Sequence, residues 1–222
     1  YWTMSPDYVQ SVWWSLKQIY DAGLLGEDHR VSPYCPRCGT GLSDHELAQG
    51  YEEITDPSVY VRFPLTSGEL PELYPGISLL VWTTTPWTLV SNTAVAANPD
   101  ATYNIVESSG DFYIVAADLV EQTFAEGFTV RASLPGTDLE RLAYSRPFDL
   151  VEIPDAHYVA LGDYVTTEDG TGLVHLAPAF GADDLIVCRE YGLPVVNPIK
   201  PDGTFAEDVA LVGGQFFKAA DA

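Results

Sequence analysis

Four threonine hydroxyls follow closely on an apolar run in the middle of the chain. The run 77–82 is typical of a buried strand. The four residues are Thr83, Thr84, Thr85 and Thr88. Pro86 between them prevents the strand from continuing as a central one. Buried hydroxyls need hydrogen-bond partners, so such a cluster suits the lining of a small polar site better than an apolar core. An exposed edge strand, where threonine is common, is the alternative.

A second stretch, residues 170–184, combines a short apolar strand, a histidine and two acids. His175 lies in the apolar run, and Asp183 and Asp184 stand at the start of a helical pattern. A carboxylate there can bind a cationic group, or it can only stabilise the helix by tenths of a kcal/mol to about 1 kcal/mol. His175 also has two possible roles: it can form a wall of a binding pocket, or it can be a hydrogen-bonded structural residue.

The two stretches together resemble the editing (CP1) domain that is inserted in isoleucyl-tRNA synthetases. The segments 5–14 and 34–40 resemble the same insertion where it leaves the catalytic core. Related valine and leucine editing domains usually carry Arg at the position of Thr85 and an acid at the position of Trp87. This difference favours the isoleucine branch. Leu176 stands where many relatives have a more polar residue, which leaves the pocket shape open.

The resemblance implies hydrolysis of mischarged Val-tRNA(Ile) in a second site too small for isoleucine. The sequence leaves open whether valyl-adenylate is a substrate as well. The residues it places in catalysis are Thr83, Thr84, Thr85, His175 and Asp184. The residues it places in substrate binding are Thr88, Asn92 and Trp82. In the resembled domains the corresponding threonines contact the terminal adenosine, the amino acid and the attacking water, and the resemblance implies that Asp184 pairs with the ammonium. His175 limits the side-chain pocket, and it is a second choice as general base after water oriented by hydroxyl groups.

The elements that must position these residues are mostly short strands separated by Pro, Gly and Asn turns. The predicted strands are 59–63, 77–82, 93–97, 103–106, 112–116, 128–132, 151–153 and 173–176. The predicted helices are 6–22, 118–125 and 183–191. There are too few crossover helices for a doubly wound sheet. The pattern favours an α+β fold, a β-barrel-like editing domain of a class I aminoacyl-tRNA synthetase with peripheral helices. We place a junction helix and half a zinc knuckle in 1–50 and the editing domain in 51–222.

Cys35 and Cys38 form a C-x-x-C pair before a glycine, a spacing that can supply two ligands of a structural zinc ion. Neither His45 nor Cys188 is an obvious further ligand. The resemblance places the remaining ligands outside this chain. The alternatives are therefore half a zinc site or two free thiols. Editing itself is expected to need no cofactor.

The composition limits the partners of the chain. Its 32 acidic and 10 basic residues give a net charge of −22, and no Lys or Arg lies between Arg62 and Arg131. Such a chain should not hold nucleic acid tightly by itself. The expected partners are the 3′ end of mischarged tRNA(Ile), the valine ester and the remainder of the synthetase polypeptide.

Several other functions are excluded or less favoured. There is no serine-hydrolase elbow, Walker loop or H-E-x-x-H motif, and we expect no membrane segment and a cytoplasmic location. The alternatives to an editing deacylase are a non-catalytic insert that binds the tRNA 3′ end or the aminoacyl group, and the editing domain of a valine-type relative. A zinc-ribbon interaction protein would depend on the two cysteines alone.

Overall fold

The computed structural model describes residues 2–221, and the chain divides into two compact units, Tyr1–Arg30 and Val31–Ala222. The smaller unit contains α1 (Pro6–Asp21), which begins where the Ser5 side chain accepts a hydrogen bond from the Tyr8 N–H. The predicted helix 6–22 is thus confirmed. None of its described residues is buried, so its apolar side chains are at least partly exposed. The division we predicted at residue 50 stays a prediction.

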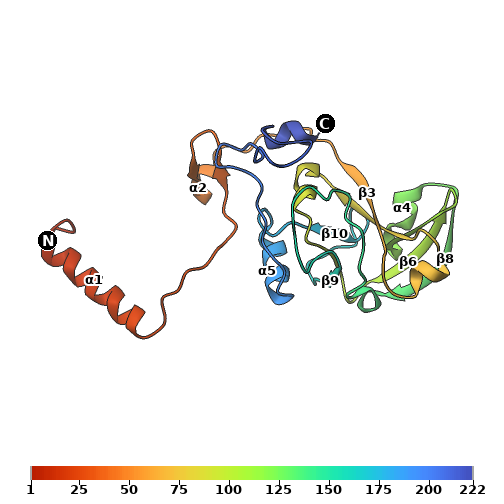
Figure 1. Cartoon of the computed structure of the whole chain (residues 1–222), viewed down its shortest axis with the longest axis horizontal. Helices are drawn as coiled ribbons and strands as arrows, with labels where there is room; N and C mark the ends of the chain where they lie inside the picture. Colours follow the sequence, from red (N-terminus) through yellow and green to blue (C-terminus); the bar gives the residue numbers. More distant parts are fainter. Residues whose placement is uncertain (1, 222) are drawn as a thin grey trace. The chain divides into compact units, whose positions relative to one another are not determined.

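The largest sheet of the second unit has five strands in the order β3-β4-β7-β6-β8. Neighbouring strands run antiparallel, except that β4 and β7 are parallel. The strands are β3 (Val59–Pro64), β4 (Ser78–Thr83), β6 (Thr102–Ser108), β7 (Asp111–Ala116) and β8 (Phe128–Pro135). In Figure 1, β6 and β8 lie with α4 at one end of this unit.

A second sheet has three strands in the order β10-β5-β9. They are β5 (Ala94–Ala97), β9 (Val159–Leu161) and β10 (Leu173–Leu176). β10 runs antiparallel to β5, with His175 opposite Val95, and β9 runs parallel to β5. β10 also packs against β4 of the larger sheet, so the histidine strand and the threonine strand are neighbours in space. The two-stranded sheet β1 (Tyr34–Cys35) and β2 (Thr40–Gly41) carries the cysteine pair.

Short helices connect the strands. The α-helices of this unit are α2 (Asp44–Ala48), α3 (Leu70–Leu73), α4 (Val120–Phe124) and α5 (Ala182–Glu190). The 3₁₀ helices are η1 (Pro86–Ser91), η2 (Ala117–Leu119), η3 (Gly136–Leu139) and η4 (Phe217–Asp221). Figure 1 shows α5 beside β9 and β10.

The three-stranded sheet is buried on both faces. Successive side chains of a strand point to opposite faces. Accordingly, Val95 and Leu173 join the core of the larger sheet, while Ala94, Ala96 and Leu176 pack with α5. His175 lies on the same face as Leu173 and therefore points away from α5. This alternation decides which neighbours its ring can reach.

The predicted α+β class is confirmed, with one difference in the architecture. The sheets of the described residues are separate, and none closes into a barrel. The expected strand at 151–153 is wrong, because that segment pairs with no neighbour and its backbone bends. β9 was not predicted, since three residues are too few to show a periodic pattern.

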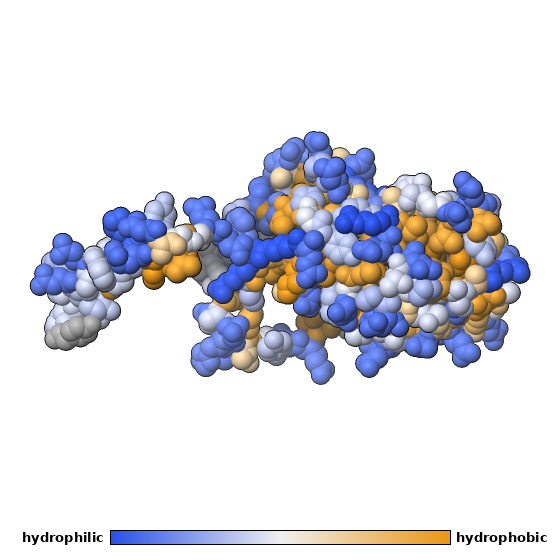
Figure 2. All heavy atoms as spheres, turned by 90° about the horizontal axis from the view of Figure 1, so that it is seen from below, coloured by the Kyte–Doolittle hydropathy of each residue, from blue (hydrophilic) through white to orange (hydrophobic). Residues whose placement is uncertain are grey.

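The surface mixes hydrophilic and apolar residues, as Figure 2 shows for one face. Such a mixture is normal for globular proteins, because polar groups are too few to cover the whole surface. None of the helices described is both long and apolar enough to cross a membrane.

Candidate functional site

The threonine cluster forms a turn between β4 and η1. Thr83, the last residue of β4, and Thr88 are buried, whereas Thr84 and Thr85 are exposed. The Thr85 N–H donates to Thr83 Oγ1 at 3.1 Å, and the Thr88 hydroxyl donates to the Thr85 carbonyl at 2.7 Å. Pro86 begins η1, where its missing N–H leaves no bond unmade. The turn therefore presents hydroxyl groups on a fixed backbone.

His175 is hydrogen-bonded to this turn. Its Nε2 lies 2.8 Å from Thr88 Oγ1, and its Nδ1 lies 3.0 Å from Asn92 Nδ2. The Asn92 side chain also donates to the Ala94 carbonyl, and its Oδ1 accepts from the Tyr144 hydroxyl at 2.7 Å. All of these side chains are at least nine-tenths buried, and the network joins η1, β5 and β10.

The partners determine which nitrogen of His175 carries the proton. The Asn92 amide nitrogen can only donate, so Nδ1 must accept. Thr88 already gives its own proton to the Thr85 carbonyl, so its oxygen accepts from a protonated Nε2. The ring is therefore neutral, with the hydrogen on Nε2. Burial lowers the pKa of His175 to about 4, which agrees with this assignment.

A neutral histidine with both nitrogens engaged is a poor general base. It would have to give up the bond from Asn92 to take a proton at Nδ1, and its low pKa opposes that step near neutral pH. The geometry instead suits a rigid support that fixes Thr88 and, through it, Thr85. The structure therefore favours His175 as a hydrogen-bonded residue that positions the turn, and not as a general base.

Asp184 lies in the first turn of α5, as the sequence suggested. Its Oδ2 accepts from the Ala177 N–H at 2.9 Å, and the Tyr164 hydroxyl lies 3.5 Å from its Oδ1. Burial raises the pKa of the Asp184 carboxyl. Among the described residues no Lys or Arg forms an ion pair with it. The neighbouring Asp183 is exposed.

Gly181 is the residue that makes room for this carboxylate. A Cβ at position 181 would lie 2.5 Å from the Asp184 Cγ. No local pattern predicts this contact, because a glycine before a helix is common for other reasons. Tyr144 and Tyr164 were also missed, since nothing in their spacing relates them to the two motifs.

The two parts of the predicted site are linked through β10. Ala177, the partner of Asp184, follows His175 by two positions, which corresponds to roughly 7 Å along a strand. Within the described residues no hydrogen bond joins Asp184 directly to the threonines or to His175. The convergence of the acid and the threonine turn on one substrate therefore stays a prediction.

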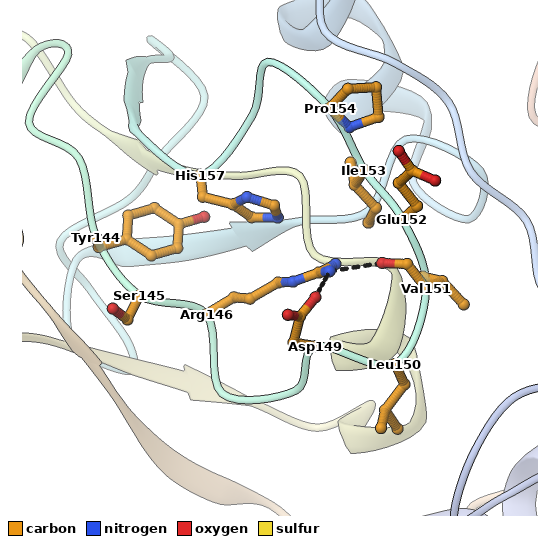
Figure 3. Close-up of a pocket in the computed structure, with 10 residues that line it drawn as sticks. All are labelled: Tyr144, Ser145, Arg146, Asp149, Leu150, Val151, Glu152, Ile153, Pro154 and His157. Atoms are coloured by element: carbon orange, nitrogen blue, oxygen red, sulfur yellow. Dashed lines mark hydrogen bonds and ion pairs between the residues drawn. The ribbon is translucent and has the colours of Figure 1, made fainter.

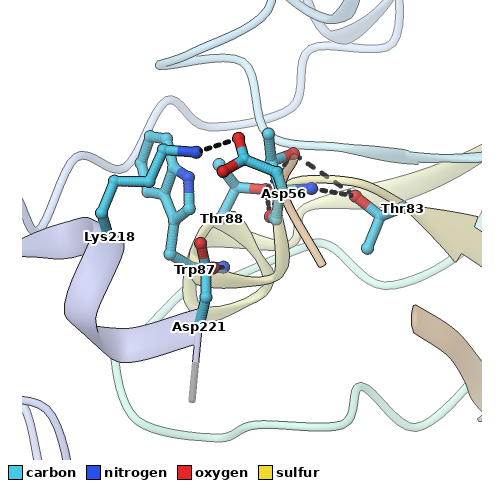
Figure 4. Close-up of polar contacts among 7 residues, drawn as sticks. Asp56, Thr83, Trp87, Thr88, Lys218 and Asp221 are labelled. Carbon is cyan, nitrogen blue, oxygen red and sulfur yellow. Dashed lines mark hydrogen bonds and ion pairs between the residues drawn. The ribbon is translucent and has the colours of Figure 1, made fainter. Parts of the chain in front are cut away.

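The C-terminal segment packs beside the threonine turn (Figure 4). The Trp87 N–H donates to Asp221 at 2.9 Å, and Lys218 pairs with Asp56. The Trp87 ring packs against Phe180 and Phe217, with centroids 4.8 Å and 4.6 Å away. Trp87 thus holds η1 against its neighbours. Trp82, which the resemblance places in substrate binding, is half-buried and lies against Gly170, and its role in binding stays a prediction.

Cys35 and Cys38 lie together at the β1–β2 turn. The Cys38 N–H donates to the Cys35 sulfur at 3.4 Å, and this bond lowers the pKa of the Cys35 thiol. A side-chain hydrogen bond with Cys35 raises the pKa of the Cys38 thiol. Two adjacent sulfurs fit half of a tetrahedral zinc site. In the described part of the chain no group of three or more suitable side chains completes one.

Comparison with known proteins gives a family match over most of the chain. Residues 1–174 match the family described as tRNA synthetases class I (I, L, M and V). The chain is 65% identical to an isoleucine–tRNA ligase of Streptomyces coelicolor over 223 residues and 47% identical to one of Thermus thermophilus over 221 residues. Both alignments cover 100% of this chain but only 21% of the relative, so the chain spans about a fifth of these proteins.

A solved structure shares the fold. The crystal structure of GlLeuRS-CP1 superposes with a TM-score of 0.51 and 18% sequence identity, over 63% of this chain and 66% of that chain. At this identity the similarity concerns the fold alone.

Proposed function

Because the chain belongs to the class I tRNA synthetases (I, L, M and V), we propose that it contains the editing domain of an isoleucine–tRNA ligase, which hydrolyses mischarged Val-tRNA(Ile). The match to the family model and the identity to isoleucine–tRNA ligases confirm the family that the two motifs predicted. The substrate, the reaction and the domain limits 51–222 are the proposal. It is supported by the fold shared with GlLeuRS-CP1 and by the 65% identity to an isoleucine–tRNA ligase.

The observation that carries the proposal is the hydrogen-bonded network from the threonine turn to β10. It presents exposed Thr84 and Thr85 on a turn that Thr88, His175 and Asn92 hold rigid. Fixed hydroxyl groups can orient a water molecule toward an ester carbonyl, and an aminoacyl ester is labile enough that orientation contributes much of the catalysis.

The Asp184 carboxylate is proposed to bind the substrate ammonium. A buried carboxylate with no cationic partner is unfavourable, as its raised pKa indicates. An ammonium at the same place would offset this penalty and fix the position of the ester. The contact between Asp184 and the substrate ammonium, together with the hydroxyl groups of the threonine turn, would then hold the scissile ester bond in place.

Selectivity for valine over isoleucine esters would come from the size of the amino-acid side chain. A synthetic site discriminates poorly between side chains that differ by one methylene, worth about 1–3 kcal/mol; the handling of valine by isoleucine enzymes is the standard example. A second site that admits valine and excludes isoleucine corrects the error. The rigid His175–Thr88 contact cannot move aside for an extra methylene, so we assign the size limit to it.

Hydrolysis of Val-tRNA(Ile) by the chain is the direct test, with Ile-tRNA(Ile) as the substrate to be spared. Replacing Asp184 with Asn should lower kcat/KM about 10- to 100-fold, because a charge-assisted contact of about 1.5–3 kcal/mol is lost. Asp183→Asn is the matched control, since it removes the same charge one residue away on an exposed side chain. Gly181→Ala should reduce activity as well while keeping the carboxylate, because its Cβ displaces Asp184.

The outcomes separate the alternatives. Equal activity of the Asp184→Asn and Asp183→Asn variants would remove the ammonium role. Binding of a valyl-adenosine analogue by the unaltered chain without any deacylation would favour the non-catalytic insert.

A further inference from the structure

A pocket of about 610 Å³ is lined by residues between 144 and 157 (Figure 3). None of the predicted catalytic residues lines it. Its titratable or charged lining residues are Tyr144, Arg146, Asp149, Glu152 and His157. A chain of net charge −22 has few buried cations, so an arginine in a pocket wall calls for an explanation.

The Arg146 side chain is only 8% exposed. Its Nη2 donates to the Asp149 carboxylate and to the Val151 carbonyl. Its Nη1 is buried and has no hydrogen-bond partner among the described residues. An unpaired buried donor costs about 1–3 kcal/mol, and more on a charged group, so half of the guanidinium fork is available to a ligand.

His157 supplies a second unpaired atom. Its Nε2 is buried without a partner in the described chain, while the ring is hydrogen-bonded to the Asn92 backbone. The residue adopts a φ of +68°, a left-handed conformation that is unusual for a side chain other than glycine. Backbone bonds from the His157 N–H to the Thr93 carbonyl and from the Tyr144 N–H to the His157 carbonyl hold it there. The strained residue is thus held beside the pocket by its neighbours.

Among the described residues, Asp149 is the acidic partner of Arg146, and it is exchangeable. The Asp149 side chain is 89% exposed, and an ion pair with one partner in solvent contributes little to stability. Asp149 can therefore turn outward into solvent once another oxyanion takes its place on the guanidinium. It occupies the position that another oxyanion would take on the guanidinium.

We propose that this pocket is an oxyanion-binding site, in which a phosphate or carboxylate group replaces the Asp149 carboxylate on Arg146 and hydrogen-bonds to His157. Guanidinium and oxyanion match in charge and in planar geometry, and Arg is the side chain best suited to this contact. The other ring nitrogen of His157 donates to the Asn92 backbone, so Nε2 takes up a proton from solvent when the anion binds and then donates to it. A single oxyanion then satisfies both the open Nη1 and the protonated Nε2. A water molecule could bond to both atoms but could not displace Asp149.

The chain offers a direct readout because it has four histidines, of which His29 and His45 are exposed. Titration with inorganic phosphate, followed by NMR of the histidine rings, should raise the apparent pKa of His157. Burial and, second to it, the charge of Arg146 lower the pKa of His157 in the free protein, and Asp149, Glu152 and Tyr144 are the other titratable groups that line the pocket. His29 and His45 should not respond. A parallel titration with acetate decides between phosphate and carboxylate as the preferred group.

Two exposed acids give matched variants that should leave the fold intact. Asp149→Asn should strengthen phosphate binding severalfold, because it removes both a negative charge and the competing partner of Arg146. Glu152→Gln removes the same charge from the same pocket without touching Arg146, and its effect should be smaller. Arg146→Lys should weaken binding roughly tenfold, since a lysine cannot keep the Val151 bond and present a second donor.

An unchanged His157 signal with both anions would overturn the proposal. So would equal gains from Asp149→Asn and Glu152→Gln, because they would reflect the overall charge rather than exchange on Arg146. Neither readout depends on ester hydrolysis, so the outcome is independent of the proposed editing function.

Discussion

At the scale of single residues, the site depends on polar atoms whose partners fix their chemistry. His175 is neutral because Asn92 occupies Nδ1 and Thr88 accepts from Nε2, and burial holds its pKa near 4. Asp184 is the opposite case, a partly buried acid whose pKa is raised and which has no described cation beside it. Both ring nitrogens of His175 have hydrogen-bond partners without a substrate, whereas the Asp184 carboxylate has no cationic partner among the described residues.

The pKa of His175 predicts how stability depends on pH. The unfolded histidine titrates near 6.5 and the folded one near 4, so the unfolded state binds the proton more tightly. The contribution to stability is full above about pH 6.5 and is lost as the pH falls toward about 4, by about 3 kcal/mol at most. Denaturant unfolding at several pH values should therefore show a shallower decline for His175→Gln than for the unaltered chain.

His45→Gln is the control for this experiment, because His45 is exposed. Its stability should follow that of the unaltered chain between about pH 6.5 and about pH 4. If His175→Gln declines as steeply as this control, the histidine is not buried as a neutral ring.

At the scale of elements, the turn before β10 sets the distance between the two sheets. Gly172 has a φ of +71°, and a Cβ there would lie 2.3 Å from the Ala116 Cβ at the end of β7. The Tyr103 hydroxyl also donates to the Gly172 carbonyl at 2.6 Å. The glycine therefore meets two requirements at once, a left-handed backbone and a close approach to the larger sheet.

Gly172→Ala should consequently destabilise the fold by more than backbone strain alone. Gly110→Ala provides the comparison, since Gly110 has a φ of +88° but no heavy atom within 4 Å of the added Cβ. We expect a loss of about 1 kcal/mol for Gly110→Ala and about 3 kcal/mol or more for Gly172→Ala, measured by urea unfolding. Similar losses for both variants would show that the sheets can separate to admit a methyl group.

At the scale of the whole molecule, the net charge of −22 opposes compact folding through self-repulsion. Added salt screens this repulsion, so the Tm should rise by several degrees between about 20 mM and about 300 mM NaCl. Sucrose at equal osmolarity serves as the control, because it favours compact states without screening charge. If the Tm changes no more in NaCl than in sucrose, repulsion between the acidic groups does not measurably destabilise the fold.

The sequence alone determined the elements whose signals are local. Helix α1 was predicted from its Ser-Pro start and helical spacing, and β4, β6, β7 and β10 from apolar runs bounded by turn residues. The family followed from the threonine and histidine motifs, and the comparisons confirm it. These features depend on residues close together in the chain.

Only the tertiary structure decided what depends on distant partners. Residues 151–153 alternate between apolar and polar like a strand but pair with no strand in the described part of the chain, whereas the three residues of β9 form a strand because β5 lies beside them. The tautomer of His175 required Asn92 and Thr88, 83 and 87 positions away. The open donors of Arg146 and His157 are likewise visible only when all neighbours are in place. Hydrogen-bond satisfaction is a property of the folded surroundings, and no local pattern in a sequence records it.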